Sequence, residues 1–145
     1  MGVLHDYFIA RDDADAKRAH ASATGPQDAG FKSIDLKGID PIVNLAVLDE
    51  IVNGRDALAW IRASAGATVA GGADDEHWVF RVAPEHATML ADLPTDLLPT
   101  ATRWAQSEEL AGSDPGDLAD VLASLRELAK EARSSGQRLY CWVSL

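Results

Sequence analysis

Cysteine is nearly absent from this chain of 145 residues, which contains only Cys141. One cysteine cannot form a disulfide within the chain, and small secreted domains usually carry several paired cysteines. We therefore expect a protein of a reducing compartment and place it in the cytoplasm. The length favours a single domain over residues 1–145, because single domains cluster near about 100 to 150 residues.

Long hydrophobic runs are also lacking. No apolar run approaches the roughly 20 residues that a membrane-spanning helix needs. The first residues, MGVLHDYFIARDD, contain a histidine and acids. A secretory signal peptide would have a basic stretch followed by a longer apolar one. The sequence therefore predicts neither membrane insertion nor export by a signal peptide.

Basic residues are few. Lysine and arginine number 13 against 23 acidic residues, which gives a net charge of −10. Such a field repels phosphate backbones, and no basic stripe interrupts it, so nucleic-acid binding is disfavoured. The same field attracts a cation or a basic protein partner, although an acidic surface that serves solubility alone is the simpler explanation.

The motifs of common cofactor sites are missing. No glycine-rich phosphate-binding pattern follows a predicted strand, and no H-E-x-x-H, paired C-x-x-C or calcium-loop spacing occurs. The acidic run at residues 74–77 contains residue types that bind divalent cations, but it is interpreted as a solvated loop. The sequence therefore predicts no cofactor and no metal site.

The last ten residues, GQRLYCWVSL, form an apolar run. In an extended strand Leu139, Cys141 and Val143 point to one side, while Tyr140 and Trp142 point to the other. A strand that is apolar on both faces is typical of an interior sheet position with cover above and below. We expect residues 138–144 to be a buried strand and Cys141 to be an inert core thiol.

Three further segments, residues 3–10, 30–36 and 77–82, alternate apolar and polar side chains as strands do. With residues 138–144 they predict a small mixed sheet of about four short strands. The stretch 64–75 is rich in small and acidic residues and is predicted to be a mobile loop.

Capping residues mark the helices between these strands. Asp40 and Asp114 each precede a proline, which predicts helix N-caps, and Gly54 and Gly136 supply left-handed stops. The helix predicted at residues 41–52 is apolar almost all round, so we expect the rest of the domain or a second copy of the chain to cover it. Strands separated by helices predict an α+β fold in which several helices pack the sheet.

Four residues are candidates for catalysis: His5, Asp6, His77 and Cys141. A small hydrolase or metal-dependent enzyme would need these side chains to converge, with contacts near about 3 Å. The alternative is that they are structural, since isolated histidines near acids usually are.

Asp6 shares a predicted strand face with Leu4 and Phe8. A buried carboxylate must be paired or hydrogen-bonded, because an isolated buried charge is very costly. We therefore expect an ion pair with Arg11, Arg81 or Lys37, with an acid-base role as the alternative.

The chain contains four tryptophans, at positions 60, 78, 104 and 142. Core packing is their usual role, but large rings also anchor interfaces. Trp60 and Trp104 lie on short amphipathic segments and are the better candidates for contact with a protein partner.

Several stretches resemble known groups of proteins. The opening MGVLHDYFIARD, KGIDP at residues 37–41, WAQSEELAG at 104–112 and LYCW at 139–142 are similar to a group of uncharacterised small actinobacterial proteins. The initial Met-Gly with a Tyr-containing strand, and the terminal helix followed by a strand, more weakly resemble the YfbM-like family of unknown function. Both resemblances imply a compact α+β domain, and neither transfers a catalytic residue or a cofactor.

The leading functional hypothesis is a non-enzymatic domain that binds another protein or a second copy of itself. It rests on the acidic surface, the apolar helix at residues 41–52 and the lack of a catalytic signature. The first alternative is the hydrolase or metal-dependent enzyme described above. A further alternative is an acidic inhibitor of a basic toxin, in the manner of an immunity protein. The sequence identifies no small-molecule ligand.

Overall fold

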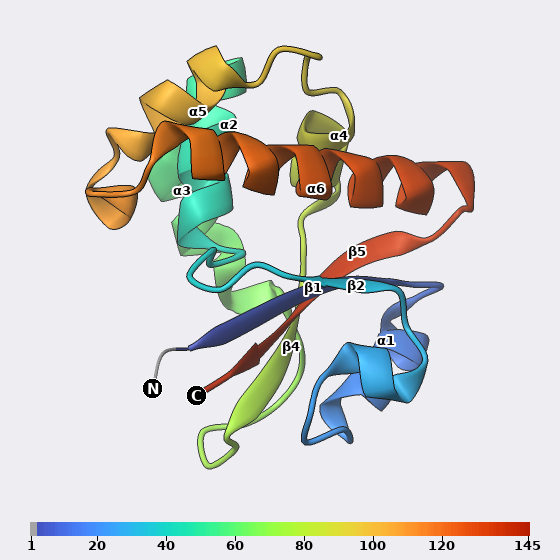
Figure 1. The fold of residues 1–145 in the computed structure, drawn as a ribbon. Coiled ribbons are helices and arrows are strands. Elements are labelled where there is room, and N and C mark those ends of the chain that lie inside the picture. The colour runs from blue at the N-terminus through green and yellow to red at the C-terminus, as the bar shows by residue number, and fades with distance from the viewer. Residues whose placement is uncertain (1–2) are drawn as a thin grey trace.

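The computed structural model describes residues 3–145 and contains a sheet of five strands with helices on both sides (Figure 1). The strands are β1 (Leu4–Ala10), β2 (Ser33–Asp35), β3 (Thr68–Ala70), β4 (His77–Arg81) and β5 (Arg138–Ser144). Their order is β2-β1-β5-β4-β3, and each neighbouring pair is antiparallel. The predicted α+β fold is confirmed, with five strands instead of about four and an antiparallel sheet instead of a mixed one.

The helices form a thick layer on one side of the sheet and a thin one on the other (Figure 1). They are α1 (Asp13–His20), α2 (Val43–Asn53), α3 (Ala57–Arg62), α4 (Pro84–Ala91), α5 (Leu98–Ala105) and α6 (Pro115–Ser134), with single 3₁₀ turns at Pro26–Ala29, Ala63–Gly66 and Glu108–Leu110. The long helix α6 lies across the sheet with α2 to α5 beside and above it, while α1 lies below. Within the described chain, none of the helices has the length and apolar character needed to cross a bilayer.

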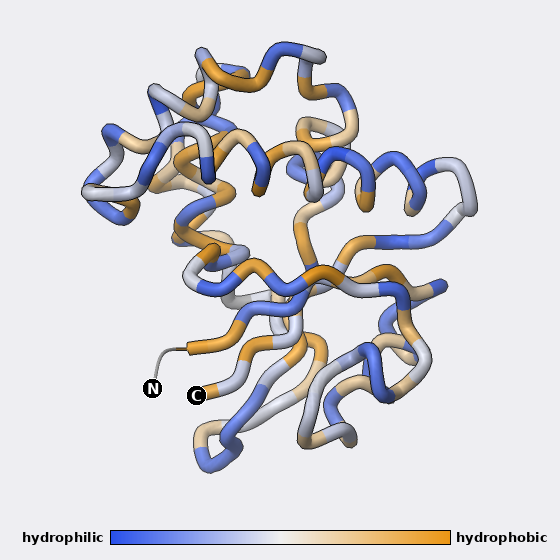
Figure 2. Tube along the Cα trace, in the orientation of Figure 1, coloured by the Kyte–Doolittle hydropathy of each residue, from blue (hydrophilic) through white to orange (hydrophobic). Residues whose placement is uncertain are grey.

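The last strand occupies the centre of the sheet, between β1 and β4. Residues 139–143 are all buried, and Cys141 and Tyr140 are fully inaccessible. The prediction of a buried interior strand is confirmed. In Figure 2 the apolar residues follow the central strands and the side of α6 that faces the sheet, while the outer side of α6 is hydrophilic.

Successive side chains of each strand point to opposite faces of the sheet, which divides the core into two parts. On the face that carries α6, which we call the α6 face, Tyr7 and Cys141 pack with the leucines of the helices. On the opposite face, the α1 face, Phe8, Tyr140 and Trp142 pack in one cluster with Ala16 and Ala19 of α1. The α6 face holds the larger cluster, because a 20-residue helix and its neighbours cover it.

Helix α2 begins two residues later than the sequence suggested. Asp40 still caps it, because its Oδ1 accepts hydrogen bonds from the N–H groups of Ile42 and Val43 at 2.8 and 2.6 Å. The side chain of Asn44 in turn accepts the N–H of Asp40 at 2.7 Å. Gly54 ends the helix with φ of 73°, as predicted.

The domain itself covers α2. Leu45 and Leu48 are fully buried, and α3, α4 and α5 pack around the helix. Of its apolar residues, Val52 is exposed to 38%, and Val43, Val47 and Ile51 are partly buried. The apolar character of α2 therefore gives no reason to expect a second copy of the chain.

The stretch 64–75 is folded, contrary to the expected mobile loop. It contains the end of the turn Ala63–Gly66 and strand β3, which pairs with β4. The indole Nε1–H of Trp78 donates to the carbonyl of Gly72 at 2.9 Å, and a Cβ at Gly71 would lie 2.3 Å from the same ring. Glycine is required there because its φ of 112° and the close approach of the indole both exclude a side chain.

Candidate functional site

The four residues singled out for catalysis lie on opposite faces of the sheet. Cys141 pairs with Tyr7 across β1 and β5, and Asp6 pairs with Trp142 in the next row. Because successive residues of a strand point to opposite faces, His5 and Cys141 lie on the α6 face while Asp6 and His77 lie on the α1 face. The sheet therefore separates them into two pairs, and the predicted enzyme site is not assembled.

Cys141 and His5 are core residues. The thiol is fully buried, and burial raises the pKa of Cys141 well above its usual value. His5 is 6% exposed, its Nδ1 accepts the N–H of Gly38 at 3.3 Å, and burial lowers its pKa. A neutral thiol without access to solvent is a poor nucleophile.

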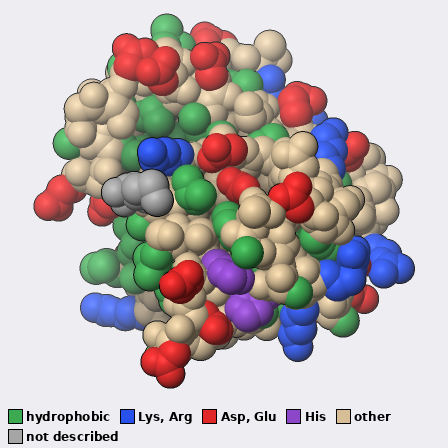
Figure 3. Space-filling model, turned by 60° about the horizontal axis from the view of Figure 1, so that its bottom comes forward, with side chains coloured by type: hydrophobic (Ala, Val, Ile, Leu, Met, Phe, Trp, Pro, Cys, Tyr) green, Lys and Arg blue, Asp and Glu red, His purple; other side chains and the backbone are tan. Residues whose placement is uncertain are grey.

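His77 belongs to a pair of histidines at the surface of the α1 face. Its ring centroid lies 5.0 Å from that of His20, and Figure 3 shows two histidines side by side with acidic residues nearby. The Nε2 of His77 contacts the carbonyl of His20 at 2.7 Å, while the Nε2 of His20 lies 3.4 Å from Asp75. In the part of the chain that the structure describes, no three potential metal ligands converge.

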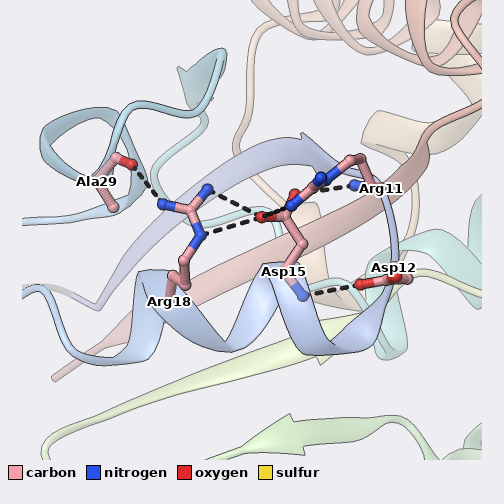
Figure 4. Close-up of polar contacts among 5 residues, drawn as sticks. All are labelled: Arg11, Asp12, Asp15, Arg18 and Ala29. Carbon is pink, nitrogen blue, oxygen red and sulfur yellow. Dashed lines mark hydrogen bonds and ion pairs between the residues drawn. The ribbon is translucent and has the colours of Figure 1, made fainter.

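Asp6 does not form the expected ion pair. Arg81 binds Asp13, and Arg11 binds Asp15 with its backbone N–H and its guanidinium (Figure 4). Lys37 forms no ion pair within residues 3–145. Burial, and then the charge of Asp35 on the neighbouring strand, raise the pKa of Asp6 to about 6.

The two candidate interface tryptophans have different environments. Trp104 is fully buried, and its Nε1–H donates to the carbonyl of Asn44 at 3.2 Å, so its prediction as a partner-binding residue is wrong. Helix α5 turns this side chain inward because α2 packs directly against it. Trp60 is half-buried and lines a cavity.

That cavity, which we call the Trp60–His86 pocket, has a volume of about 300 Å³. It lies between the residues before α2, helix α3 with its following turn, and the start of α4. Its wall is mainly apolar and consists of Pro41, Ile42, Trp60, Ala63, Ala67, Ala83 and Pro84, with Ser64, Gly66, Arg81, Glu85 and His86. Sites that bind small molecules in proteins typically have this volume, a mainly apolar wall and a few polar groups.

His86 is the buried polar group of this pocket. It is 4% exposed, and its ring centroid lies 4.6 Å from that of Trp60. Its Nε2 has no hydrogen-bond partner in the described chain and lies 3.8 Å from Oδ2 of Asp49, beyond hydrogen-bond distance. Burial lowers the pKa of His86, so the imidazole is neutral near pH 7.

Asp49 is fixed behind His86. The carboxylate is fully buried and accepts two hydrogen bonds from Arg55 and one from Asn53, each 2.8 Å long. Burial alone would raise the pKa of Asp49, but these hydrogen bonds hold it below its usual value. The negative charge favours the proton on Nε2 of His86, which leaves Nδ1 as an acceptor.

The first turn of α4, whose residues line the pocket, contains two N–H groups without a partner in the helix. Its N-cap, Ala83, offers no side-chain hydrogen bond, and Pro84 has no N–H. The N–H groups of Glu85 and His86 therefore have no partner within the helix. Ser64 is not activated as a nucleophile, because its hydroxyl donates to the carbonyl of Ile61 at 2.6 Å. The arrangement provides hydrogen-bonding groups beside an aromatic ring, which is the chemistry of binding.

Asp49 and His86 were not predicted from the sequence to be site residues. One signal was present, because Asp49 is a charged residue within a helix predicted to be buried almost all round, and such a charge requires a partner. Arg55, six residues later, provides it. The position of His86 beside Trp60 depends on the packing of α4 against α2, which no local pattern encodes.

Comparisons with protein-family models, with curated proteins and with solved structures gave no match to this chain. The resemblances to small actinobacterial proteins and to the YfbM-like family therefore stay predictions.

Proposed function

We propose that this protein binds a small, uncharged, ring-containing molecule in the Trp60–His86 pocket, in the reducing cytoplasm that a lone cysteine favours. The observation that carries the proposal is the apolar cavity in whose wall the rings of Trp60 and His86 lie together, with their centroids 4.6 Å apart. The imidazole of His86 is buried, and burial lowers its pKa, so it is neutral near pH 7. Its Nδ1 is the acceptor that remains when Asp49 favours the proton on Nε2.

The lining residues define the ligand. At roughly 30 Å³ for each water-sized group, the cavity holds about ten non-hydrogen atoms. A planar ring stacks on Trp60, a donor group of the ligand bonds Nδ1 of His86, and an acceptor group meets the free N–H groups of α4. Arg81 and Glu85 contribute opposite charges to the wall, which favours a ligand without net charge.

The proposal is tested by titrating benzamide and indole into isotope-labelled protein and following the NMR signals of the Trp60 indole and the His86 ring. We expect both signals to shift and to give one dissociation constant. Trp60→Ala removes the stacking surface and weakens binding by roughly tenfold. Leu58→Ala is the matched control, because Leu58 lies on the same helix, is 57% exposed and does not line the pocket.

Two results would contradict the proposal. One is that neither probe moves the two signals at millimolar concentration. The other is that Leu58→Ala weakens binding as much as Trp60→Ala does, which would place the contact on the outer surface of α3.

A further inference from the structure

The outer edge of β2 presents backbone groups that no other strand uses. The N–H of Leu36 bonds the carbonyl of His5, and the N–H of Ile9 bonds the carbonyl of Lys32. In an antiparallel pair the residues that bond the neighbour alternate with residues that face away. The N–H and C=O groups of Ser33 and Asp35 therefore point away from β1, toward the open edge of the sheet.

The opposite edge of the sheet is less suited to accept another strand. Strand β3 pairs with β4 through an irregular register at Thr68 and Ala70. Such irregularities disrupt a ladder and twist an edge away from a partner strand. Strand β2 keeps a regular register with β1 over its whole length, so it is the better template.

A pair of like charges lies beside this open edge. Asp6 and Asp35 are directly opposite each other on the α1 face, in the row where the side chains of an antiparallel pair come closest. Like charges in this arrangement destabilise a sheet. Across residues 3–145 neither carboxylate forms an ion pair, and Arg11 and Arg81 bind Asp15 and Asp13 instead. The pair lacks a cation on the side where the sheet is open.

The α6 face beside the same edge contains a hollow of about 370 Å³. Ile34 of β2 and Ala123 and Leu128 of α6 provide its apolar wall, and Lys32, Ser124 and Glu127 its rim. Ile34 is only partly buried. An added strand would place the residue opposite Ile34 over this hollow, because directly opposite residues share a face.

We propose that β2 docks an extended segment of a basic protein partner, which adds a sixth strand to the sheet. The residue opposite Asp35 is lysine or arginine, which brings a positive charge to Asp35 and Asp6. The residues before and after it are apolar, and one of them covers Ile34. Main-chain hydrogen bonds to Ser33 and Asp35 supply affinity and the alternate side chains supply specificity, as in other strand-addition complexes.

Charge complementarity selects this occupant over a second copy of the chain. The protein carries a net charge of −10, so two copies repel each other, while a basic partner is attracted over the whole surface. A basic toxin is one class of protein that would carry such a segment. The inference is independent of ligand binding in the Trp60–His86 pocket, which involves none of the residues at this edge.

The test uses the blocked peptide Thr-Val-Lys-Val-Thr and the same peptide with glutamate in place of lysine. We expect the lysine peptide to shift the amide signals of Ser33 and Asp35 and to slow their hydrogen exchange, while the glutamate peptide has no effect. The lysine peptide should also lower the pKa of Asp6, which is about 6 in the free protein.

Charge variants sharpen this test. Asp35→Asn should weaken binding of the lysine peptide by about fivefold, which is the range of an exposed ion pair. Asp35→Lys should reverse the preference between the two peptides. Asp74→Asn is the matched control, because it makes the same change of net charge in the exposed turn before β4, and it should leave binding within about twofold.

Three outcomes would overturn the proposal. The first is equal binding of the two peptides, or no binding of either at millimolar concentration. The second is that the shifts fall on β3 instead of β2. The third is a dimer in sedimentation with the amides of Ser33 and Asp35 already protected without peptide, which would assign the edge to a second copy of the chain.

Discussion

Different kinds of interaction stabilise the packing on the two faces of the sheet. On the α6 face, leucines of α6 such as Leu122 and Leu125 are fully buried against β1, β5 and the neighbouring helices. On the α1 face a smaller cluster is supplemented by charged contacts, in which Asp13 binds Arg81 and accepts the hydroxyl of Tyr140 at 2.9 Å. Apolar burial does not depend on pH, whereas each of these carboxylates titrates. The comparison therefore predicts that apolar burial on the α6 face sets most of the stability and that the ion pairs of the α1 face make part of it depend on pH, as the buried Asp49 beside α2 also does.

The largest expected effect is the difference between the rates at which a reagent labels Cys141 in native and in unfolded protein. The thiol lies on the α6 face at the centre of the sheet, so a reagent reaches it only when the core opens. We expect labelling by a thiol reagent in native protein to be about a thousandfold slower, or more, than in urea, because core opening costs much of the global stability. Labelling is followed by absorbance. Rapid labelling of native protein would contradict the burial of Cys141 on the α6 face.

Truncation of the α6 face should give the largest change in stability. Leu125→Ala removes a fully buried side chain and should lower the free energy of unfolding by about 3 kcal/mol. Urea denaturation followed by circular dichroism measures this change. Leu98→Ala is the control, because Leu98 is 52% exposed, and it should change stability by less than about 0.5 kcal/mol.

The hydrogen bonds around Asp15 allow a test of the ionic contribution to stability on the α1 face (Figure 4). Burial alone would raise the pKa of Asp15, but hydrogen bonds from Arg11 and Arg18 lower it to about 2. Asp15→Asn should cost about 1 to 2 kcal/mol at pH 7, near the lower end of what hydrogen bonds to charged groups contribute, because the side chains of Arg11 and Arg18 are largely exposed to solvent.

The sign of the pH dependence follows from the lowered pKa of Asp15. The carboxylate contributes its stability above its ordinary pKa near 3.8 and loses it as the pH falls toward 2. Urea denaturation at pH 7 and at pH 2 should therefore show the wild type and Asp15→Asn converging at the lower pH. A difference that persists unchanged at pH 2 would contradict an ionic contribution.

Replacement of Asp6 should give the smallest change in stability, and the change should have the opposite sign to that of Asp15→Asn. Its pKa is raised to about 6, first by burial and then by Asp35, so the folded state is most stable with Asp6 protonated. Stability associated with this group is present below pH 3.8 and is lost as the pH rises through 6. Asp6→Asn should therefore stabilise the protein by about 1 kcal/mol at pH 7 and should have no effect near pH 3. The expected gain is small because Asp6 is only partly buried and solvent screens its charge.

Local signals in the sequence predicted the local parts of the fold. Asp114 caps α6 through a hydrogen bond from the N–H of Asp117, and Gly136, with φ of 70°, follows its end. The apolar faces of residues 138–144 identified a central strand. These features depend on neighbours in the chain, so a pattern of a few residues is enough to reveal them.

The candidate site could not be predicted in this way. His5, Asp6, His77 and Cys141 were grouped by residue type, but the pleat of the strands places them on two sides of the sheet. Trp104 was proposed for an interface, and the contact between α5 and α2 buries it instead. The turn at Gly71 was expected to be mobile because small residues give no periodic signal, and the indole of Trp78 orders it.

The sequence by itself determined the α+β class, the ends of α6, the buried position of Cys141 and the acidic surface. Only the tertiary structure decided the strand order, the contact between Trp60 and His86 and the open edge at β2. Helix caps and strand alternation are encoded by residues a few positions apart. The distance between Asp49 and His86, and the absence of a strand beyond β2 in residues 3–145, result from packing between segments far apart in the chain.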